Sequence, residues 1–173
     1  MLMSSATDVS VLIFSTNMNI SRTMRTALRG MGVRRVHLAL DESGIMEGFA
    51  TADPTVVIVY VDGPEKDDGL ERLRWLRRAP NSPKRQIPVV VASQSRDMAT
   101  INAVINAGGN EYVLFPASGD QLLKKITAAR NSNRPFIEAA DYVGPCRRRR
   151  ADPLYKGPER RAGAAPRAEP KAS

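Results

Sequence analysis

The chain has 173 residues, a hydrophobic fraction of 42%, a charged fraction of 25% and a formal net charge of +8. This composition is ordinary for a globular protein, and no apolar run approaches the roughly 20 residues that a membrane-spanning helix needs. A single cysteine, Cys146, excludes an intrachain disulfide, and no basic segment precedes the first apolar stretch, so we expect a soluble, cytoplasmic protein without a secretory signal or a membrane span.

Five short apolar runs alternate with five segments of helical periodicity over residues 1–130. The runs at 9–14, 56–61 and 89–92 are nearly continuous and rich in β-branched residues, which indicates strands covered on both faces. The alternation predicts an α/β fold with a doubly wound, five-stranded parallel sheet. In chain order the expected strands are 9–14, 36–40, 56–61, 89–92 and 112–115, and the expected helices are 20–31, 42–50, 69–78, 97–107 and 119–130.

The expected helix at 69–78 has a leucine stripe and a strongly basic remainder. Trp75 lies off the stripe, either packed under a neighbouring loop or exposed as a contact residue. A basic run of this kind is usually the solvated face of a helix, and we expect that here. The basic residues of this helix and the loop after it are Arg72, Arg74, Arg77, Arg78, Lys84 and Arg85.

Functional groups in a doubly wound sheet collect where the strands end, and three segments there carry a family resemblance. Residues 54–70, 87–93 and 107–116 resemble the third, fourth and fifth strands, with their loops, of the receiver domains of two-component response regulators. The resemblance covers about residues 8–130 and implies a flavodoxin-like, CheY-like fold and a role in phosphorelay signalling. In this family, acids after the first strand hold Mg²⁺, an aspartate after the third accepts phosphate, and a hydroxyl and a lysine follow the fourth and fifth.

The chain departs from that chemistry at nearly every position. Ser15, Thr16 and Asn17 stand where the family has acids, and neutral oxygens bind Mg²⁺ only weakly. Tyr60 stands at the acceptor position and Phe115 at the lysine position, while Ser93 keeps the hydroxyl. A phenol cannot form an acyl phosphate, and a phenyl ring supplies no cation. We therefore predict a degenerate phosphoacceptor pocket, filled by the two aromatic rings, with no catalytic residue, no metal and no cofactor.

Asp62 keeps a second hypothesis open. It lies two residues after Tyr60, so strand alternation puts both side chains on the same side. With Glu65, Asp67 and Asp68 nearby, it would be a displaced phosphate acceptor in a phosphate-switched regulator, or a metal ligand. We favour a solvated acidic turn, because neither a lysine nor an acid after the first strand supports that chemistry.

The leading interpretation is a phosphorylation-independent signalling adaptor, not an enzyme, which acts on partner proteins that the sequence does not identify. Tyr112 stands at the position of the aromatic that the family uses as a rotating switch. The resemblance places the partner face on the fourth helix, fifth strand and fifth helix. The residues of this predicted face are Met98, Ile101, Asn102, Tyr112, Gln121 and Lys125.

From residue 131 onward Pro, Gly, Arg and Ala dominate, which predicts a flexible basic tail over 131–173. Residues 133–173 hold 10 Lys/Arg against 5 Asp/Glu, so they carry +5 of the net +8. The tail contains the motif Tyr-x-Gly-Pro-x-Arg-Arg twice, offset by 13 residues. The fixed positions are Tyr142, Gly144, Pro145, Arg147 and Arg148 in the first copy and Tyr155, Gly157, Pro158, Arg160 and Arg161 in the second.

Three interpretations of this tail remain. We rank first a short linear motif that orders on an acidic partner protein. A solubilising tail ranks second. Contact with DNA or RNA ranks third, because non-specific binding to phosphates needs no fixed Gly-Pro turn.

Overall fold

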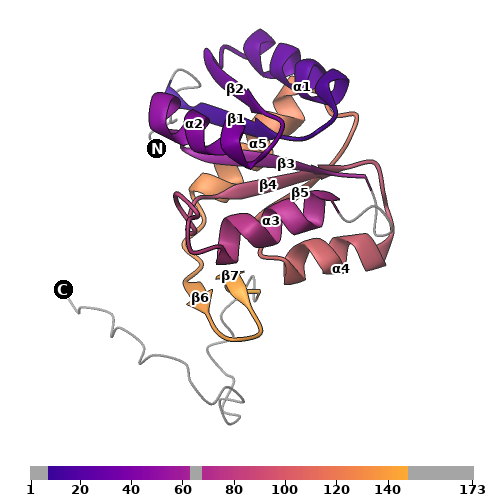
Figure 1. Cartoon of the computed structure of the whole chain (residues 1–173). Coiled ribbons are helices and arrows are strands. Elements are labelled where there is room, and N and C mark those ends of the chain that lie inside the picture. Colours follow the sequence, from indigo (N-terminus) through magenta and orange to yellow (C-terminus); the bar gives the residue numbers. More distant parts are fainter. Residues whose placement is uncertain (1–7, 63–67, 148–173) are drawn as a thin grey trace, which may run out of the picture.

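The computed structural model describes residues 8–62 and 68–147. Within them, five helices alternate with five strands, and a two-stranded hairpin follows (Figure 1). The elements are β1 (Ser10–Phe14), α1 (Met18–Gly30), β2 (Arg35–Ala39), α2 (Glu42–Ala52), β3 (Val56–Val61), α3 (Asp68–Arg78), β4 (Val89–Ser93), α4 (Met98–Asn106), β5 (Glu111–Leu114), α5 (Gly119–Arg130), β6 (Phe136–Glu138) and β7 (Val143–Pro145).

The first ten elements confirm the predicted fold class. The strands form a parallel sheet in the order β2-β1-β3-β4-β5, with β3 at its centre. Every predicted helix and strand is present, and its ends differ from the prediction by at most two residues. No helix in the described part of the chain is both long and apolar enough to cross a membrane.

Each strand of the sheet contributes alternate side chains to two hydrophobic cores. Helices α1 and α5 cover one face, where Met24 and Leu122 pack on β1, β3, β4 and β5. Helices α2, α3 and α4 cover the other face, where Ile45, Leu73 and Val104 are fully or almost fully buried. Figure 1 shows α3 and α4 in front of the sheet and α5 behind it. This packing explains the nearly continuous apolar runs, since both faces of the central strands are covered.

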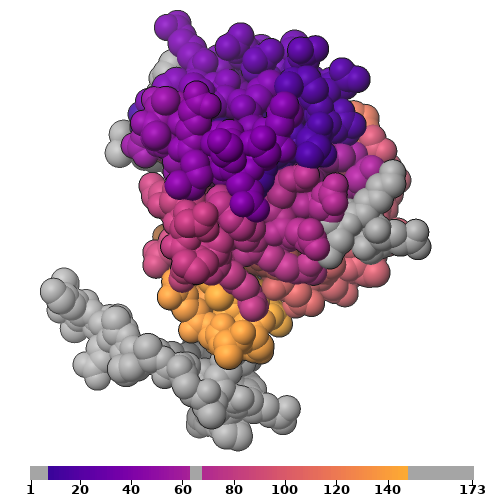
Figure 2. Space-filling view, viewed as in Figure 1, coloured from indigo at the N-terminus to yellow at the C-terminus, as the bar shows by residue number. Residues whose placement is uncertain are grey.

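Residues 131–147 do not form the flexible segment that their composition predicts. Strands β6 and β7 pair antiparallel with Ile137 opposite Gly144, and Tyr142 is only 5% exposed. Figure 2 shows this hairpin in orange, packed against one end of the domain. The predicted start of the tail at residue 131 is therefore wrong, because these residues bury apolar surface against the domain. Residues 148–173, with the second copy of the motif, lie outside the described part of the chain.

Arg77 contradicts the expectation of a uniformly solvated basic helix. Its side chain is 1% exposed, and its guanidinium donates hydrogen bonds to the carbonyl oxygens of Gly108 at 3.0 Å and Ile87 at 2.7 Å. It also donates to the carbonyl oxygen of Arg85 and, at 2.8 Å, to Oδ1 of Asn110. The reason is that the C-terminal end of α3 lies over the loops that lead into β4 and β5, whose carbonyl groups need donors once they are buried.

The structure also shows whether Trp75 is packed or exposed. Its ring packs edge-on against Phe14, with 6.5 Å between the centroids and 65° between the ring planes. The side chain is half-buried against the core on the α2, α3 and α4 face. Of the two alternatives, the structure supports the packed one.

Candidate functional site

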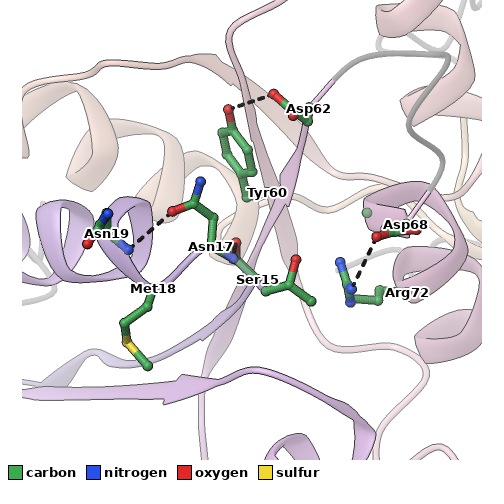
Figure 3. A pocket seen from close by; sticks show the side chains of 10 residues that line it. Ser15, Asn17, Met18, Asn19, Tyr60, Asp62, Asp68 and Arg72 are labelled. Atoms are coloured by element: carbon green, nitrogen blue, oxygen red, sulfur yellow. Dashed lines mark hydrogen bonds and ion pairs between the residues drawn. The ribbon is translucent and has the colours of Figure 1, made fainter.

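An open pocket of about 420 Å³ lies at the carboxyl ends of β1 and β3, where the fold predicts a functional site. Figure 3 shows its side chains around the end of β3. The pocket is bounded by the turn into α1, the end of β3 and the first turn of α3. Its lining residues are Ser15, Thr16, Asn17, Met18, Asn19, Tyr60, Asp62, Asp68, Gly69 and Arg72.

The turn from β1 into α1 uses its polar side chains to hold backbone groups. Ser15 is 1% exposed, and its Oγ accepts a hydrogen bond from the backbone N–H of Asn17 at 3.0 Å. Oδ1 of Asn17 accepts from the backbone N–H groups of Asn19 and Ile20, each at 3.2 Å, and so caps the helix. Thr16 is exposed at the pocket wall. These residues supply neutral oxygens, two of which already accept hydrogen bonds from the backbone.

Tyr60 lies on β3, at the position that the sequence analysis assigned to the family's phosphate acceptor. Its hydroxyl donates to Oδ1 of Asp62 at 3.3 Å, so the two side chains lie on the same side of the strand, as their spacing predicts (Figure 3). Phe115 packs edge-on against the Tyr60 ring, with 6.1 Å between centroids and 81° between planes. Burial raises the pKa of Tyr60 to about 12, and the Asp62 carboxylate adds to the shift. The phenol therefore stays protonated at neutral pH and acts as a donor.

Ser93 and Phe115 support the pocket from the core and do not line it. Ser93 is fully buried at the end of β4, opposite Val61, and its Oγ accepts from the backbone N–H of Ser95 at 3.2 Å. Phe115 is 8% exposed and reaches the site only through its contact with Tyr60. Of the five predicted pocket residues, the structure thus brings Ser15, Thr16 and Tyr60 to the surface of the pocket.

The donors that the described residues bring to this pocket do not suit Mg²⁺, the metal that the family resemblance implies. Mg²⁺ prefers carboxylate oxygens in octahedral geometry. Of the two carboxylates at the pocket, Asp62 accepts from Tyr60, and Asp68 lies 3.9 Å from the Arg72 guanidinium. Across residues 8–62 and 68–147, no three His, Cys, Asp or Glu side chains gather where they could hold a metal ion. Glu65 and Asp67, named above as neighbours of Asp62, lie outside the described residues.

Arg72 is a pocket residue that the sequence interpretation missed. It was expected on a solvated helix face, yet it lines the pocket, and its guanidinium carbon lies 5.5 Å from the centroid of the Phe14 ring. The first turn of α3 comes this close because residue 69 is a glycine. A Cβ on Gly69 would lie 2.3 Å from the carbonyl oxygen of Tyr60. The signal in the sequence was the Asp68-Gly69 pair at the start of the helix.

The predicted partner face contains three exposed and three half-buried side chains. Met98 is 65% exposed at the start of α4, and Asn102 and Gln121 are also exposed. Ile101 and Lys125 are half-buried. Lys125 forms an ion pair with Glu111 at 3.1 Å, and Gln121 completes a capping box with Ser118 at the start of α5.

Tyr112, the sixth residue of this face, points its hydroxyl toward the loop before α4. The hydroxyl donates to the carbonyl oxygen of Ser95 at 2.5 Å. Oγ of Ser95 lies 3.0 Å from the hydroxyl of Thr100 on α4 and accepts from the backbone N–H of Asp97 at 3.2 Å. The ring of Tyr112 therefore couples β5 to the start of α4.

Comparison with known proteins agrees with this architecture. Residues 11–127 match the family model described as the response regulator receiver domain. The chain is 30% identical over 120 residues to the KDP operon transcriptional regulatory protein KdpE of Escherichia coli (strain K12). That alignment covers 69% of this chain and 50% of KdpE, so the chain spans about half the length of this curated relative.

Two solved structures show the same fold. The chemotaxis protein CheY4 of Vibrio cholerae gives a TM-score of 0.57 at 18% identity, covering 70% of this chain and 98% of that one. A putative response regulator from Chloroflexus aurantiacus J-10-fl gives a TM-score of 0.59 at 20% identity, covering 72% of this chain and 98% of that one. At these identities the likeness speaks for the fold alone.

Proposed function

The chain belongs to the response regulator receiver family, and on that premise we propose that it is an adaptor whose state is not set by phosphorylation. It would act by binding other proteins of a two-component or phosphorelay pathway. Receiver domains are generally not enzymes, and the proposal assigns this chain no catalytic step.

One observation supports the proposal most directly: Tyr60, which the family resemblance assigns to the acceptor position, is buried, and burial raises its pKa to about 12. Tyr60 is 6% exposed, and its hydroxyl is held by Asp62. The aromatic contact with Phe115 brings a second apolar side chain to the position where the family has a lysine. A protonated phenol is a poor nucleophile, and Phe115 supplies no cation at the lysine position to offset the charge that develops on a transferred phosphoryl group.

The partner face would be the surface around Met98 and Tyr112. Met98 is a large apolar side chain that is 65% exposed, so it is available for contact with a partner. The Tyr112 hydroxyl already has a partner at Ser95, so α4 and β5 are held together without any event at the pocket. The face would therefore be present in the protein as it folds.

Incubation of the purified chain with Mg²⁺ and acetyl phosphate, followed by intact-mass measurement, tests the independence from phosphate. The proposal expects no phosphoryl adduct. A matched control restores the family's residues by Tyr60→Asp, Phe115→Lys and Ser15→Asp in one variant. An adduct on the restored variant alone would show that the assay works and that the native pocket is inert.

A second candidate function, a phosphate-switched regulator with Asp62 as acceptor, rests on the position of that residue. Asp62 is exposed at the pocket, and Arg72 brings a cation to the same pocket from α3. If this candidate is correct, the native chain gains a phosphoryl group that is absent from the Asp62→Asn variant. The same result would overturn the adaptor proposal.

A further inference from the structure

The two copies of Tyr-x-Gly-Pro-x-Arg-Arg remain unexplained by the site at the carboxyl ends of the strands. The first copy is part of the hairpin at the opposite end of the sheet. It rests on what we call the hairpin dock, formed by Arg77, Gly108, Asn110 and strand β6. The contacts of Tyr142, Gly144, Pro145 and Arg147 show what these four fixed positions do there, while Arg148 lies outside the described residues.

The backbone of the hairpin lies very close to the backbone of the dock, because Gly144 and Gly108 face each other there. A Cβ on Gly144 would lie 2.6 Å from the Cα of Gly108, and a Cβ on Gly108 would lie 2.4 Å from the carbonyl oxygen of Val143. Gly108 also has a φ of +97°, a conformation that favours glycine. The glycine of the motif is therefore a requirement of docking.

Tyr142, Pro145 and Arg147 stabilise the turn that contains Gly144. The Tyr142 hydroxyl donates to the carbonyl oxygen of Pro145 at 2.5 Å, and the guanidinium carbon of Arg147 lies 4.0 Å from the centroid of the Tyr142 ring. Burial raises the pKa of Tyr142, so the phenol keeps the proton it donates. The variable positions, Val143 and Cys146, are only half-buried. The second copy keeps all the fixed residues and changes only these two, to Lys156 and Glu159.

Strand β6 has no counterpart ahead of the second copy. Residues 136–138 read Phe-Ile-Glu, whereas the residues at the same offset before Tyr155 read Arg-Arg-Ala. The Phe136 ring lies 5.5 Å from the guanidinium carbon of Arg77 and so belongs to the dock itself. Any docking of the second copy would thus reuse β6 and replace only β7.

We propose that residues 155–161 are a second ligand for the hairpin dock of the same chain and exchange with residues 142–148. Lys156–Pro158 would take the place of Val143–Pro145 beside β6. The connecting loop would lengthen from 139–142 to 139–155, and loop-closure entropy disfavours this state by roughly tenfold. That factor is small enough for exchange and agrees with the first copy being the one seated on the dock.

In the exchanged state, the first copy, including Arg147 and the Tyr142 ring that it contacts, would no longer occupy the dock. A partner that captures the first copy would then leave the dock filled by the second. This gives the duplication a use that a single motif could not supply, and it does not depend on whether the pocket at the other end of the sheet is phosphorylated.

Three variants of the full chain test the proposal: Gly144→Ala, Gly157→Ala and the double variant. For each variant, the amide resonance of Gly108 and the midpoint of chemical unfolding are measured. Gly157→Ala should match the native chain. Gly144→Ala should keep most Gly108 amides in the docked position, because the second copy takes over, and the double variant should lose that position. Identical spectra and unfolding midpoints for Gly144→Ala and the double variant would overturn the proposal.

Truncation after residue 148 provides an independent control. In the Gly144→Ala background it should empty the dock as the double variant does, while in the native background it should leave the dock filled. If the rescue by the second copy grows with protein concentration and dimers appear in sedimentation, the motif would act between chains, which contradicts exchange within one chain.

Discussion

The two ends of the sheet differ in what their polar residues do. At the carboxyl ends of β1 and β3, the polar side chains of Ser15, Asn17 and Tyr60 are engaged with neighbouring residues around an open pocket. At the amino ends of β4 and β5, Arg77 is buried, and its guanidinium cross-links three carbonyl oxygens and Asn110 beneath the hairpin. At the first end, polar side chains surround an open pocket, whereas at the second a buried charged residue holds backbone carbonyl groups together.

This difference teaches that residue type alone does not locate function in this fold. The charged side chain that looks most available in the sequence, within an arginine-rich helix, is the most deeply buried cation among the described residues. The site that the family resemblance identifies contains mostly neutral groups. Substitutions at the hairpin end should therefore change the free energy of unfolding strongly, and substitutions at the pocket should change it little.

The largest effect is expected for Arg77→Met. The change leaves buried carbonyl oxygens and Asn110 without their donor, and we expect the free energy of unfolding to fall by about 3 kcal/mol. Burial lowers the pKa of Arg77 to about 10, which still leaves it charged at neutral pH. Urea unfolding of the variant and of Arg22→Met, an exposed arginine on α1, measures the difference. Equal losses in both would contradict the structural role of Arg77.

Gly108→Ala should come next. Its positive φ and the contact with Val143 leave no room for a Cβ, so we expect a loss of about 2 kcal/mol and a loosened hairpin. Gly30→Ala is the matched control, since nothing lies within 4 Å of a Cβ there and the residue is helical. That control should be neutral or stabilising by about 0.5 kcal/mol. Thermal unfolding of both variants measures the difference. If Gly108→Ala leaves the stability unchanged, the close contact between Gly108 and the hairpin is contradicted.

Tyr60→Phe should cost only about 1 kcal/mol, the usual contribution of one hydrogen bond. It also has a signature in pH. The pKa of Tyr60 is raised to about 12 in the folded protein, so its contribution is complete below the ordinary value of about 10 and is lost as pH rises toward 12. Between pH 10 and pH 12, the free energy of unfolding should fall less steeply for the phenylalanine variant than for the native chain. Parallel curves would mean that Tyr60 is not buried with Asp62.

The smallest effect on stability is expected at the predicted partner face. Met98→Glu changes an exposed side chain and should alter the free energy of unfolding by less than about 0.5 kcal/mol, yet weaken binding of a signalling partner. Met46→Glu, at a methionine of α2 that is 40% exposed, is the control. Binding of a partner isolated with the native chain would be measured for both variants. Equal affinities would place the interface elsewhere.

The fold was predictable because it depends on local patterns. Buried strands such as Val56–Val61 are continuous apolar runs, and the period of two along β3 was enough to place Tyr60 and Asp62 on one side. Helix starts use ordinary capping residues, as at Asn17 before α1, which local sequence specifies. These features need only a few neighbouring residues to specify them.

The rest depends on groups that come together only in three dimensions. The burial of Arg77 requires carbonyl oxygens from residues 85, 87 and 108, and the sequence gives no sign that they meet. Strands β6 and β7 have three residues each, too short for any periodicity to show. Arg72 reaches the pocket only because Gly69 lets α3 approach the end of β3. The sequence was enough to locate the pocket but not to identify all the residues that line it.

The most direct test of the central claim is an amide NMR titration of the chain with Mg²⁺ and beryllofluoride, an acyl-phosphate mimic. The account predicts no saturable shifts at Ser15, Tyr60, Asp62 or Ser93, because it proposes that the phenol of Tyr60 replaces the phosphate acceptor. Saturable shifts at these residues that vanish in the Asp62→Asn variant would contradict it and would make the chain a phosphate-switched regulator.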